Sequence, residues 1–449
     1  MFGKLLVANR GEIAVRVIRA CRELGVGTVA VYSTADAASA AVRMADQAVC
    51  IGPGPARQSY LNMPNVIGAA VKTGADAIHP GYGFLSEDAY FAEICRDHGI
   101  TFIGPPPEVM EILGDKATAR AAMARAGLPL LPGTVSALRS EQEAIEAADA
   151  CGFPLLLKAS AGGGGRGITL VRERGDLPAA LRTTRAQARA LFNDPSVYLE
   201  RYLEPARHVE VQVLCDNHGN AVHLGERDCS VQRRNQKLLE ESPSPAVDPE
   251  LRDRLGEAAL AGVRSIDYRG VGTVEFLLDE DGKFWFMEIN ARIQVEHPVT
   301  ELVTSVDLVA GQIRVAAGEP LRIRQADVVL RGHAVECRIN AEDSERGFAP
   351  TPGRIETCVV PGGPGVRFDS HCTAGSEIPP YYDSLIGKVL TWSDNRHAAL
   401  DRMARVLREL TISGPGLHTT IPFHLDLVNH PDFRAGRVTT TWMQNRPAQ

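Results

Sequence analysis

The sequence feature that most constrains the fold is a pair of apolar runs joined by an Asp-Gly step. Residues 272–290 read GTVEFLLDEDGKFWFMEIN, and Asp-Gly at 281–282 is a strong β-hairpin signal. A two-residue loop at this step, or a four-residue loop centred on it, places Glu275 directly opposite Glu288. Facing residues on paired strands have Cβ atoms roughly 4.5–5.5 Å apart, and like charges there destabilise the pair. The fold must offset this repulsion.

Two interpretations of the facing glutamates are open at this stage. Both side chains can be solvated on an exposed sheet face, or they can form a buried site that holds a cation. Asn290 follows Glu288 by two residues and therefore shares its face. Carboxylate and amide oxygens are hard ligands, so the second interpretation predicts a magnesium site. Large apolar neighbours favour it, namely Val274, Phe276, Met287 and Ile289.

The alternation continues past the predicted metal residues. Residues 285–298 read WFMEINARIQVEHP, with a charged or amide side chain at every second position from Glu288 to Glu296. Period two is typical of an extended strand. The pattern therefore predicts that Arg292 and Glu296 lie on one side of an extended chain, beside the metal.

Composition excludes several classes of protein. The chain has 449 residues, too many for one ordinary core, with 44% hydrophobic and 23% charged residues. No apolar run is long enough to span a bilayer, and the first residues do not resemble a secretory signal. The net charge of -7 gives no basic field for nucleic acid. Nine scattered cysteines without a CxxC pair fit reduced thiols, so we expect a cytoplasmic protein.

The order of helix-like and strand-like segments along the sequence predicts an α/β and α+β multidomain chain. Residues 1–113 alternate strand and helix signals, which predicts a parallel sheet in a Rossmann-like domain. An alanine-rich helix opens a second domain over 114–328, whose residues 132–203 form a lid around a glycine tract. Residues 329–449 are β-rich and end in helices.

The glycine tract AGGGGRG at 161–167 has two open interpretations. It can be a flexible hairpin turn, or a loop whose backbone N–H groups approach a phosphate. A P-loop is excluded because no GK[ST] follows and the next residues, ITLV, look like a strand. Lys158, on the run that enters the tract, can supply a cation. We therefore expect a phosphate-binding hairpin flap.

Taken together, these motifs resemble one family. The flap with its preceding lysine and the hairpin Glu…Glu-x-Asn resemble the ATP-grasp superfamily. Within it, HPGYGFLSE, RDCSVQRRNQK, EINARIQVEHPVTE, RGHAVECRINAED and YYDSLIGK resemble biotin carboxylase over nearly the whole chain. The resemblance implies an ATP-grasp fold with a Rossmann-like N-terminal domain and a β-rich C-terminal domain. It also implies ATP-dependent carboxylation of biotin by bicarbonate, through carboxyphosphate.

The resemblance implies roles for single residues. Lys237, Arg292, Gln294 and Val295 would bind bicarbonate, and Glu296 would deprotonate it. Arg338, with Tyr82, would serve the biotin ureido group. Two Mg²⁺ or Mn²⁺ ions would be held by Glu275, Glu288 and Asn290. ATP would be bound by Lys116, Lys158, Gly164, Gly165, Glu200, Arg201, Tyr202, Leu203, His208 and Asn235, together with Glu275 and Glu288.

One residue departs from the family pattern. In QRRNQK at 232–237, Asn235 stands where the family usually has His. Asn can donate a hydrogen bond but cannot become a cation near pH 6.5. The replacement is either neutral, or it weakens nucleotide binding or alters the pH dependence.

The resemblance also implies partners. The sequence has no MKM-type biotin attachment motif, so we expect biotin to arrive on a biotin carboxyl carrier protein. A carboxyltransferase component and a homodimer are expected as well, with acetyl-CoA carboxylase as the parent complex. No nucleic acid or membrane partner is expected. The rival hypothesis is a nucleotide-binding regulatory paralogue without carboxylase activity, which the full set of charged catalytic residues disfavours.

Overall fold

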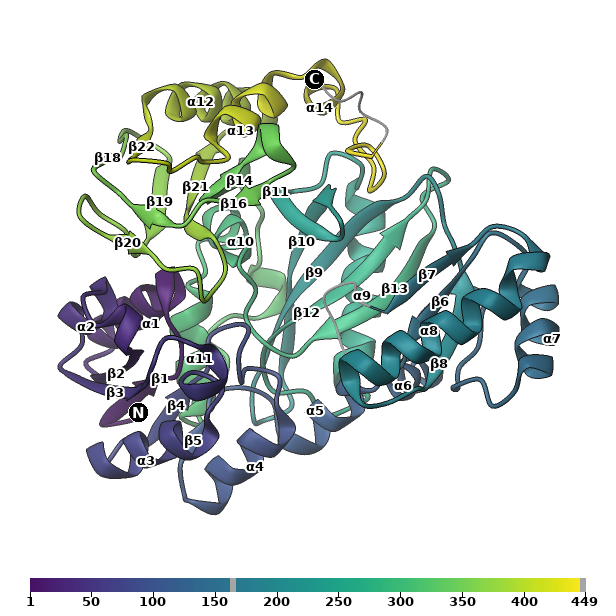
Figure 1. Cartoon of the computed structure of the whole chain (residues 1–449), viewed down its shortest axis with the longest axis horizontal. Helices are drawn as coiled ribbons and strands as arrows, with labels where there is room; N and C mark the ends of the chain where they lie inside the picture. The colour runs from purple at the N-terminus through teal and green to yellow at the C-terminus, as the bar shows by residue number, and fades with distance from the viewer. Residues whose placement is uncertain (162–166, 445–449) are drawn as a thin grey trace.

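In the computed structural model, which describes residues 1–161 and 167–444, the N-terminal region is a parallel sheet with helices on both faces (Figure 1). Its strand order β3-β2-β1-β4-β5 confirms the predicted Rossmann-like arrangement. Leu5, Val7 and Ala77 are buried on one face, and Leu6 and Ile78 on the other. The strands are β1 (Lys4–Val7), β2 (Gly27–Ser33), β3 (Gln47–Gly52), β4 (Ala77–His79) and β5 (Thr101–Phe102), and the helices are α1 (Gly11–Glu23), α2 (Ala40–Met44), α3 (Met63–Thr73), α4 (Ala89–Asp97) and α5 (Pro107–Gly114).

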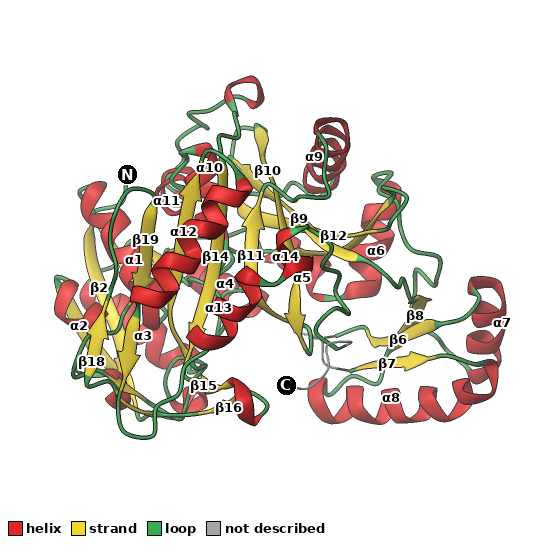
Figure 2. Cartoon of the chain, turned by 90° about the horizontal axis from the view of Figure 1, so that it is seen from above, coloured by secondary structure: helices red, strands yellow, loops and turns green. Residues whose placement is uncertain are grey.

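The predicted lid is a small lobe with its own apolar core (Figure 2). Within the described residues its sheet has the order β7-β6-β8, and Lys158 pairs with Ile168 across the glycine tract. This pairing confirms a hairpin at the tract, whose residues 162–166 lie outside the described part of the chain. The elements are β6 (Leu155–Ala159), β7 (Ile168–Val171), β8 (Val197–Arg201), α7 (Glu141–Cys151) and α8 (Leu177–Phe192), preceded by α6 (Lys116–Arg125).

A mixed-length antiparallel sheet forms the centre of the molecule. Its strand order among the described residues is β13-β12-β9-β10-β11-β14-β21-β19. The last three strands follow the boundary expected near residue 329, so the second and third predicted domains share one continuous sheet. The strands are β9 (Arg207–Cys215), β10 (Ala221–Arg233), β11 (Gln236–Ser242), β12 (Gly270–Leu278), β13 (Phe284–Asn290), β14 (His333–Asn340), β19 (Val366–Ser370) and β21 (Leu385–Ser393).

Helices pack against this sheet. Those that follow the strands are α9 (Pro249–Arg264), α10 (His297–Thr304), α11 (Leu308–Ala316), α12 (Arg396–Glu409), α13 (Ile421–Asn429) and α14 (Pro431–Arg434). The C-terminal core places Val335, Cys337 and Val389 against Leu400 and Met403 of α12. Short two-stranded ladders complete the region: β15 (Glu342–Asp343) with β16 (Ala349–Pro350), β17 (Gly353–Arg354) with β20 (Glu377–Ile378), and β18 (Thr357–Val359) with β22 (Thr411–Ser413).

Two features of the described chain bear on its surroundings. All nine cysteines lie in the described part of the chain and are free thiols. In residues 1–161 and 167–444, none of the helices has the length and apolar character required to cross a bilayer.

A buried ion pair fastens the C-terminal helices to the central sheet. Glu241 of β11 accepts from Arg396 of α12 at 2.6 and 2.9 Å and contacts His333 of β14 at 2.7 Å. Burial opposes ionisation of Glu241, but these two partners outweigh it and lower its pKa from 4.5 to about 2. The folded pKa is depressed, so the stabilisation is full above pH 4.5 and is lost as the pH falls towards 2.

We therefore predict that Glu241→Gln lowers the free energy of unfolding by about 3 kcal/mol at pH 7, and that this deficit shrinks between pH 4.5 and 2. Urea unfolding of both proteins across this range measures the difference. Glu280→Gln, at an exposed loop position, is the matched control. A deficit that stays constant down to pH 2 would contradict the assignment.

Candidate active site

One face of the central sheet carries a row of charged side chains on adjacent strands. Glu275 of β12 pairs in register with Glu288 of β13 on one side and with Glu210 of β9 on the other. Glu210 in turn pairs with Arg227 of β10. Directly paired residues project from the same face of a sheet. Three carboxylates and a guanidinium therefore lie side by side.

The predicted pairing of Glu275 with Glu288 is confirmed, but the predicted loop was wrong. The paired strands end at Leu278 and Phe284, and the Asp279 N–H donates to the Lys283 carbonyl at 2.9 Å, so the loop spans residues 279–283. A β-bulge at Met287 then shifts the register by one residue and places Glu288 opposite Glu275.

The bulge also corrects the expected set of apolar neighbours. Phe286 packs in the core with Phe276, whereas Met287 is the extra residue of the bulge. Val274 and Ile289 are buried in the same core, as expected. The bulge thus lets both apolar pairs face the core while both glutamates face the site.

Lys237 is the centre of the charged site. Its Nζ lies 2.5 Å from Glu210, 3.0 Å from Glu275 and 2.6 Å from Glu296, and it donates to Gln294 at 2.9 Å. Burial opposes the charge on Lys237, but the three carboxylates outweigh it, and the pKa of Lys237 lies well above its ordinary value. One ammonium therefore holds together β9, β11, β12 and the loop after β13.

A second set of cations compensates the remaining carboxylates. Arg227, fully buried, pairs with Glu210 at 2.6 Å and donates to Gln212 at 2.6 Å. His208 lies 3.0 Å from Glu275. Burial disfavours ionisation of Glu275, yet Lys237 and His208 hold its pKa well below the ordinary value. A buried charge is tolerated only when it is paired in this way.

The two lysines that are predicted to bind ATP both lie close to the start of the glycine tract. Lys116 is the first residue of α6, and its backbone N–H donates to the Ser160 carbonyl at 3.0 Å, next to the glycine tract. Its ammonium pairs with Glu288. Lys158, at the end of β6, pairs with Glu200, which also binds Arg120 at 2.8 Å. Gly164 and Gly165, predicted to cover the phosphates, lie outside the described residues.

The predicted adenine segment follows Glu200 along the edge of the lid. Arg201 ends β8, and its N–H donates to the Pro132 carbonyl at 2.7 Å. The Tyr202 N–H donates to the Pro154 carbonyl at 3.0 Å, and Leu203 is half-buried beyond it. The backbone of this segment is thereby fixed to the lid.

The chain beyond β13 is not extended as the period-two pattern predicted. The strand ends at Asn290, and residues 291–296 form turns before α10 begins at His297. Arg292 donates to Asn290 at 3.1 Å and pairs with Glu87 at 3.2 Å, while Gln294 bridges Lys237 and Glu275. The polar residues still converge, because the turns direct them to one cluster rather than along one strand face.

Glu296 lies between two cations at the start of α10. It contacts Lys237 at 2.6 Å and Arg338 at 2.9 Å. Burial opposes its ionisation, but Lys237, Arg338 and Arg227 outweigh burial, and the pKa of Glu296 falls well below its ordinary value. Glu296 is therefore an ionised carboxylate at neutral pH, in direct contact with both cations.

Arg338 of β14 is shared between two carboxylates. It binds Glu296 at 2.9 Å, and its Nε donates to Glu240 of β11 at 2.6 Å. Burial raises the pKa of Glu240 to about 7, because Arg338 only partly offsets the desolvation and Glu296 adds repulsion. Arg338 is thus fixed beside the predicted base.

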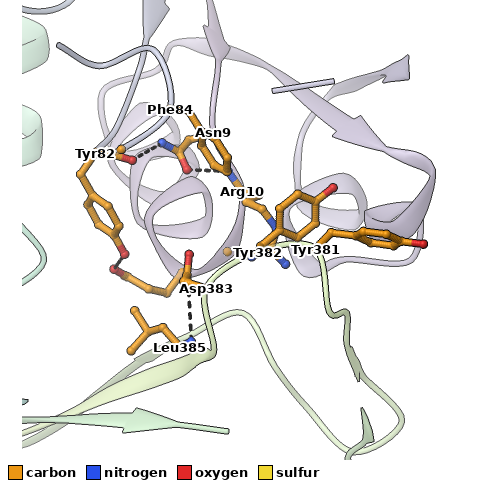
Figure 3. A pocket seen from close by; sticks show the side chains of 11 residues that line it. Asn9, Arg10, Tyr82, Phe84, Tyr381, Tyr382, Asp383 and Leu385 are labelled. Atoms are coloured by element: carbon orange, nitrogen blue, oxygen red, sulfur yellow. Dashed lines mark hydrogen bonds between the residues drawn. The ribbon is translucent and has the colours of Figure 1, made fainter. Parts of the chain in front are cut away.

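The second predicted biotin residue, Tyr82, lies at a pocket between the N-terminal and C-terminal regions (Figure 3). The pocket measures about 180 Å³ and is lined by Arg10, Phe84, Tyr382 and Asp383, among others. Arg10 stacks on the Tyr382 ring at 4.2 Å. The Tyr82 hydroxyl donates to Glu12 at 2.6 Å.

Asn235 occupies the tip of the β10–β11 hairpin. Both turn residues, Arg234 and Asn235, have positive φ, at 50° and 63°, and both are exposed. Asn and His both adopt this left-handed conformation more often than most other residues, although less readily than Gly. The backbone at this position therefore accommodates the replacement.

The row of carboxylates fits a divalent cation. Glu275 and Glu288 face each other on paired strands, and each already pairs with basic side chains, which shows that this position demands positive charge. Their oxygens are the hard ligands that Mg²⁺ and Mn²⁺ prefer. Asn290, the third predicted ligand, donates to Glu275 at 2.8 Å and directs its oxygen towards Arg292.

Several site residues escaped the sequence analysis. Glu210 was detectable, because His208, Glu210 and Gln212 alternate with three valines in RHVEVQVLC, the same period-two signal as in the hairpin. Arg227, Glu240 and Glu12 carry no comparable local signal and join the site through strand pairing and packing. His79 and His297 are both buried within hydrogen-bonding distance of nearby backbone, which fits a structural role.

The N-terminal parallel sheet, the lid with its hairpin flap and the Glu…Glu-x-Asn hairpin define an ATP-grasp enzyme. Three family models match the chain: "Biotin carboxylase, N-terminal domain" over residues 1–110, "Carbamoyl-phosphate synthase L chain, ATP binding domain" over 115–324, and "Biotin carboxylase C-terminal domain" over 336–445. The chain belongs to the biotin carboxylase family, as its motifs predicted.

Relatives agree along the whole chain. A biotin carboxylase of Nostoc sp. is 55% identical, with 99% of both chains covered. The biotin carboxylase domain dimer of Hydrogenobacter thermophilus 2-oxoglutarate carboxylase, in complex with MgADP, ADP and bicarbonate, is 49% identical with a TM-score of 0.96 over 100% of this chain and 98% of that one. A Campylobacter jejuni biotin carboxylase in complex with β,γ-ATP is 45% identical with a TM-score of 0.97 and covers 99% of each chain.

Proposed function

We propose that this chain carboxylates biotin carried by a partner protein, using ATP and bicarbonate. The observation that carries the proposal is the position of Glu296, an ionised carboxylate held between Lys237 and Arg338 next to the carboxylate row. The residues proposed for the base, the anion site and the metal site thus belong to one cluster of side chains. Family membership and the bicarbonate-bound relative support the same reaction.

Bicarbonate would bind on the loop after β13. Arg292 and Lys237 offer positive charge, and Gln294 and the Val295 backbone offer hydrogen bonds around it. Bicarbonate holds its remaining proton tightly, so an adjacent base is required, and Glu296 would accept that proton. The freed oxygen attacks the γ-phosphorus of ATP, which gives carboxyphosphate and ADP.

ATP would lie between the central sheet and the lid. Lys116 and Lys158 would contact its phosphates, with Gly164 and Gly165 above them. Glu200 to Leu203 would contact the adenine, His208 the ribose, and Asn235 remains a predicted nucleotide contact. Glu275 and Glu288, with Asn290, would hold Mg²⁺ or Mn²⁺, which neutralises phosphate charge during transfer.

Biotin would enter beside Tyr82 and meet Arg338. Carboxyphosphate yields CO₂ and phosphate, and the phosphate removes the ureido proton, so negative charge develops on the ureido oxygen. The Arg338 guanidinium would stabilise that charge. Because Arg338 binds Glu296 directly, a proton received by Glu296 weakens this ion pair and frees the guanidinium for biotin. The two steps would thereby occur in order.

Partners follow from the substrate. Biotin would arrive on a biotin carboxyl carrier protein, and a carboxyltransferase component would take the carboxyl group to its acceptor, with acetyl-CoA carboxylase as the proposed parent complex. A homodimer is supported by the dimeric Hydrogenobacter thermophilus relative. The free thiols favour a cytoplasmic location. The rival function, nucleotide-dependent regulation without carboxylation, is disfavoured because Lys237, Arg292, Glu296 and Arg338 converge at one place.

The overall reaction can be tested on the purified protein. With Mg²⁺, ATP and free biotin, the purified protein releases ADP only when bicarbonate is present, measured by a coupled ADP assay. Arg292→Ala lowers kcat/KM for bicarbonate by about a hundredfold or more, because it removes the main anion contact. Arg125→Ala, on the exposed end of α6, retains activity. Folded wild-type protein without bicarbonate-dependent ADP release would favour the regulatory function instead.

Two variants distinguish the activation of bicarbonate by ATP from the carboxylation of biotin. Arg338→Met keeps the slow bicarbonate-dependent ATP cleavage that occurs without biotin but loses its stimulation by biotin, because the ureido oxygen loses its partner while Lys237 still holds Glu296. Glu296→Gln loses both activities. Rates with and without biotin, together with melting temperatures as a folding control, distinguish the variants. Equal loss of both activities in Arg338→Met would refute the assigned role.

A further inference from the structure

Lys388 is a fully buried lysine that takes no part in the proposed reaction steps. It lies on β21, in register between Arg338 of β14 and Asp369 of β19. Its side chain is 0% exposed. An ammonium is expensive to bury unless its surroundings use the charge. Its contacts therefore indicate what it does.

The Lys388 ammonium joins three separate segments of the fold. It donates to the Val295 carbonyl at 2.8 Å and pairs with Glu12 of α1 at 2.9 Å. The oxygen of Glu12 that binds Lys388 is also the one that accepts from the Tyr82 hydroxyl at 2.6 Å. The bicarbonate loop, the N-terminal domain and the biotin pocket thus meet at one lysine.

The surroundings keep Lys388 charged. Besides Glu12, the carboxylates of Glu336 and Asp369 act on it, and together they outweigh burial and raise its pKa. Glu12 itself is buried, and its second oxygen has no hydrogen-bond partner among the described residues. The hydrogen bond to the Val295 carbonyl is therefore a charge-assisted one, the stronger kind.

Val295 is the residue between Gln294 and Glu296. Both neighbours contact Lys237, so the loop is held by one lysine from the central sheet face and by a second lysine at its backbone. A carbonyl fixed in this way sets the orientation of the peptide groups around it. Displacement of this loop would move the anion contacts and the base together.

We propose that Lys388 is a positioning residue for bicarbonate, acting through the Val295 carbonyl, with Glu12 as the counter-ion that fixes it beside Tyr82. The inference rests on the proposed function, because it assigns bicarbonate to this loop. Lys388 does not touch the reacting atoms. Its effect should therefore appear in the affinity for bicarbonate and not in the affinity for ATP.

The test separates positioning from simple charge balance. Lys388→Met should raise the KM for bicarbonate about tenfold, as loss of groups that orient a ligand typically does, with the KM for ATP changed less than about twofold. It also leaves Glu12 buried without its cation, which lowers the melting temperature. The double variant Glu12→Gln/Lys388→Met removes that charge and should recover melting temperature while it keeps the raised KM for bicarbonate.

A control uses a partly buried ion pair whose hydrogen bonds do not involve residues 291–296. Arg252 of α9 pairs with Glu226 of β10 at 2.7 Å, and Glu226→Gln/Arg252→Met should leave the KM for bicarbonate unchanged. An unchanged KM in Lys388→Met, or full recovery of the KM in the Glu12→Gln/Lys388→Met variant, would overturn the proposal.

Direct binding distinguishes this inference from the proposed function. Calorimetric titration of bicarbonate in the presence of MgADP needs no turnover. If wild-type protein cleaves no ATP, the proposed function fails, while weaker bicarbonate binding by Lys388→Met still supports positioning. Equal binding by both proteins, or no binding by wild-type protein, overturns it.

Discussion

The structure depends on the compensation of buried carboxylates by a few cations at the centre of one sheet. Glu275 has a glutamate on each side, and this arrangement is stable only because Lys237, His208, Lys116 and Arg227 surround the row. Lys237 contributes most, since it contacts carboxylates from two strands and from the loop after β13. The proposed anion binding and proton transfer fall where this charge is concentrated.

The continuous sheet explains how distant sequence segments reach that centre. Its strands run from the hairpin with Glu288 to β14 and β21, which carry Arg338 and Lys388, so the residues proposed for the nucleotide and for biotin share one sheet (Figure 1). The lid is a separate lobe with its own core, and Lys116 contacts both parts, through its N–H to the Ser160 carbonyl of the lid and through its ammonium to Glu288 of the sheet. Chemistry on a rigid sheet beneath a distinct lid suits a reaction that must exclude water.

The sequence predicted the features that follow from local periodicity. Glu275 and Glu288 were paired correctly although the predicted loop was wrong, because the bulge at Met287 offsets the one-residue difference in the loop. The hairpin around the glycine tract followed from its flanking strands. The bulge at Met287 could not be predicted, because it reflects the packing of Phe276 against Phe286 in the folded core. Residues 291–296 form turns, but every second residue there is polar, as in a strand, and the sequence therefore predicted an extended chain.

Residues that act through non-local contacts were the ones that sequence reasoning missed. Lys388 lies in an apolar run, and only its contacts with Val295 and Glu12 in the folded chain mark it as a candidate site residue. Arg227 and Glu210 become site residues only once β9 pairs with both β10 and β12. The resemblance to a family supplied roles for Arg292 and Arg338 that spacing alone did not.

We propose that the facing carboxylates form a site for a divalent cation at the nucleotide phosphates. Calorimetric binding of ADP with and without Mg²⁺, in wild-type protein and in Glu288→Gln, tests it most directly. We expect Mg²⁺ to strengthen ADP binding by the wild type and to lose that effect in Glu288→Gln, whose metal-free affinity should be equal or higher because one negative charge is gone. A magnesium effect of the same size in both proteins would contradict the account.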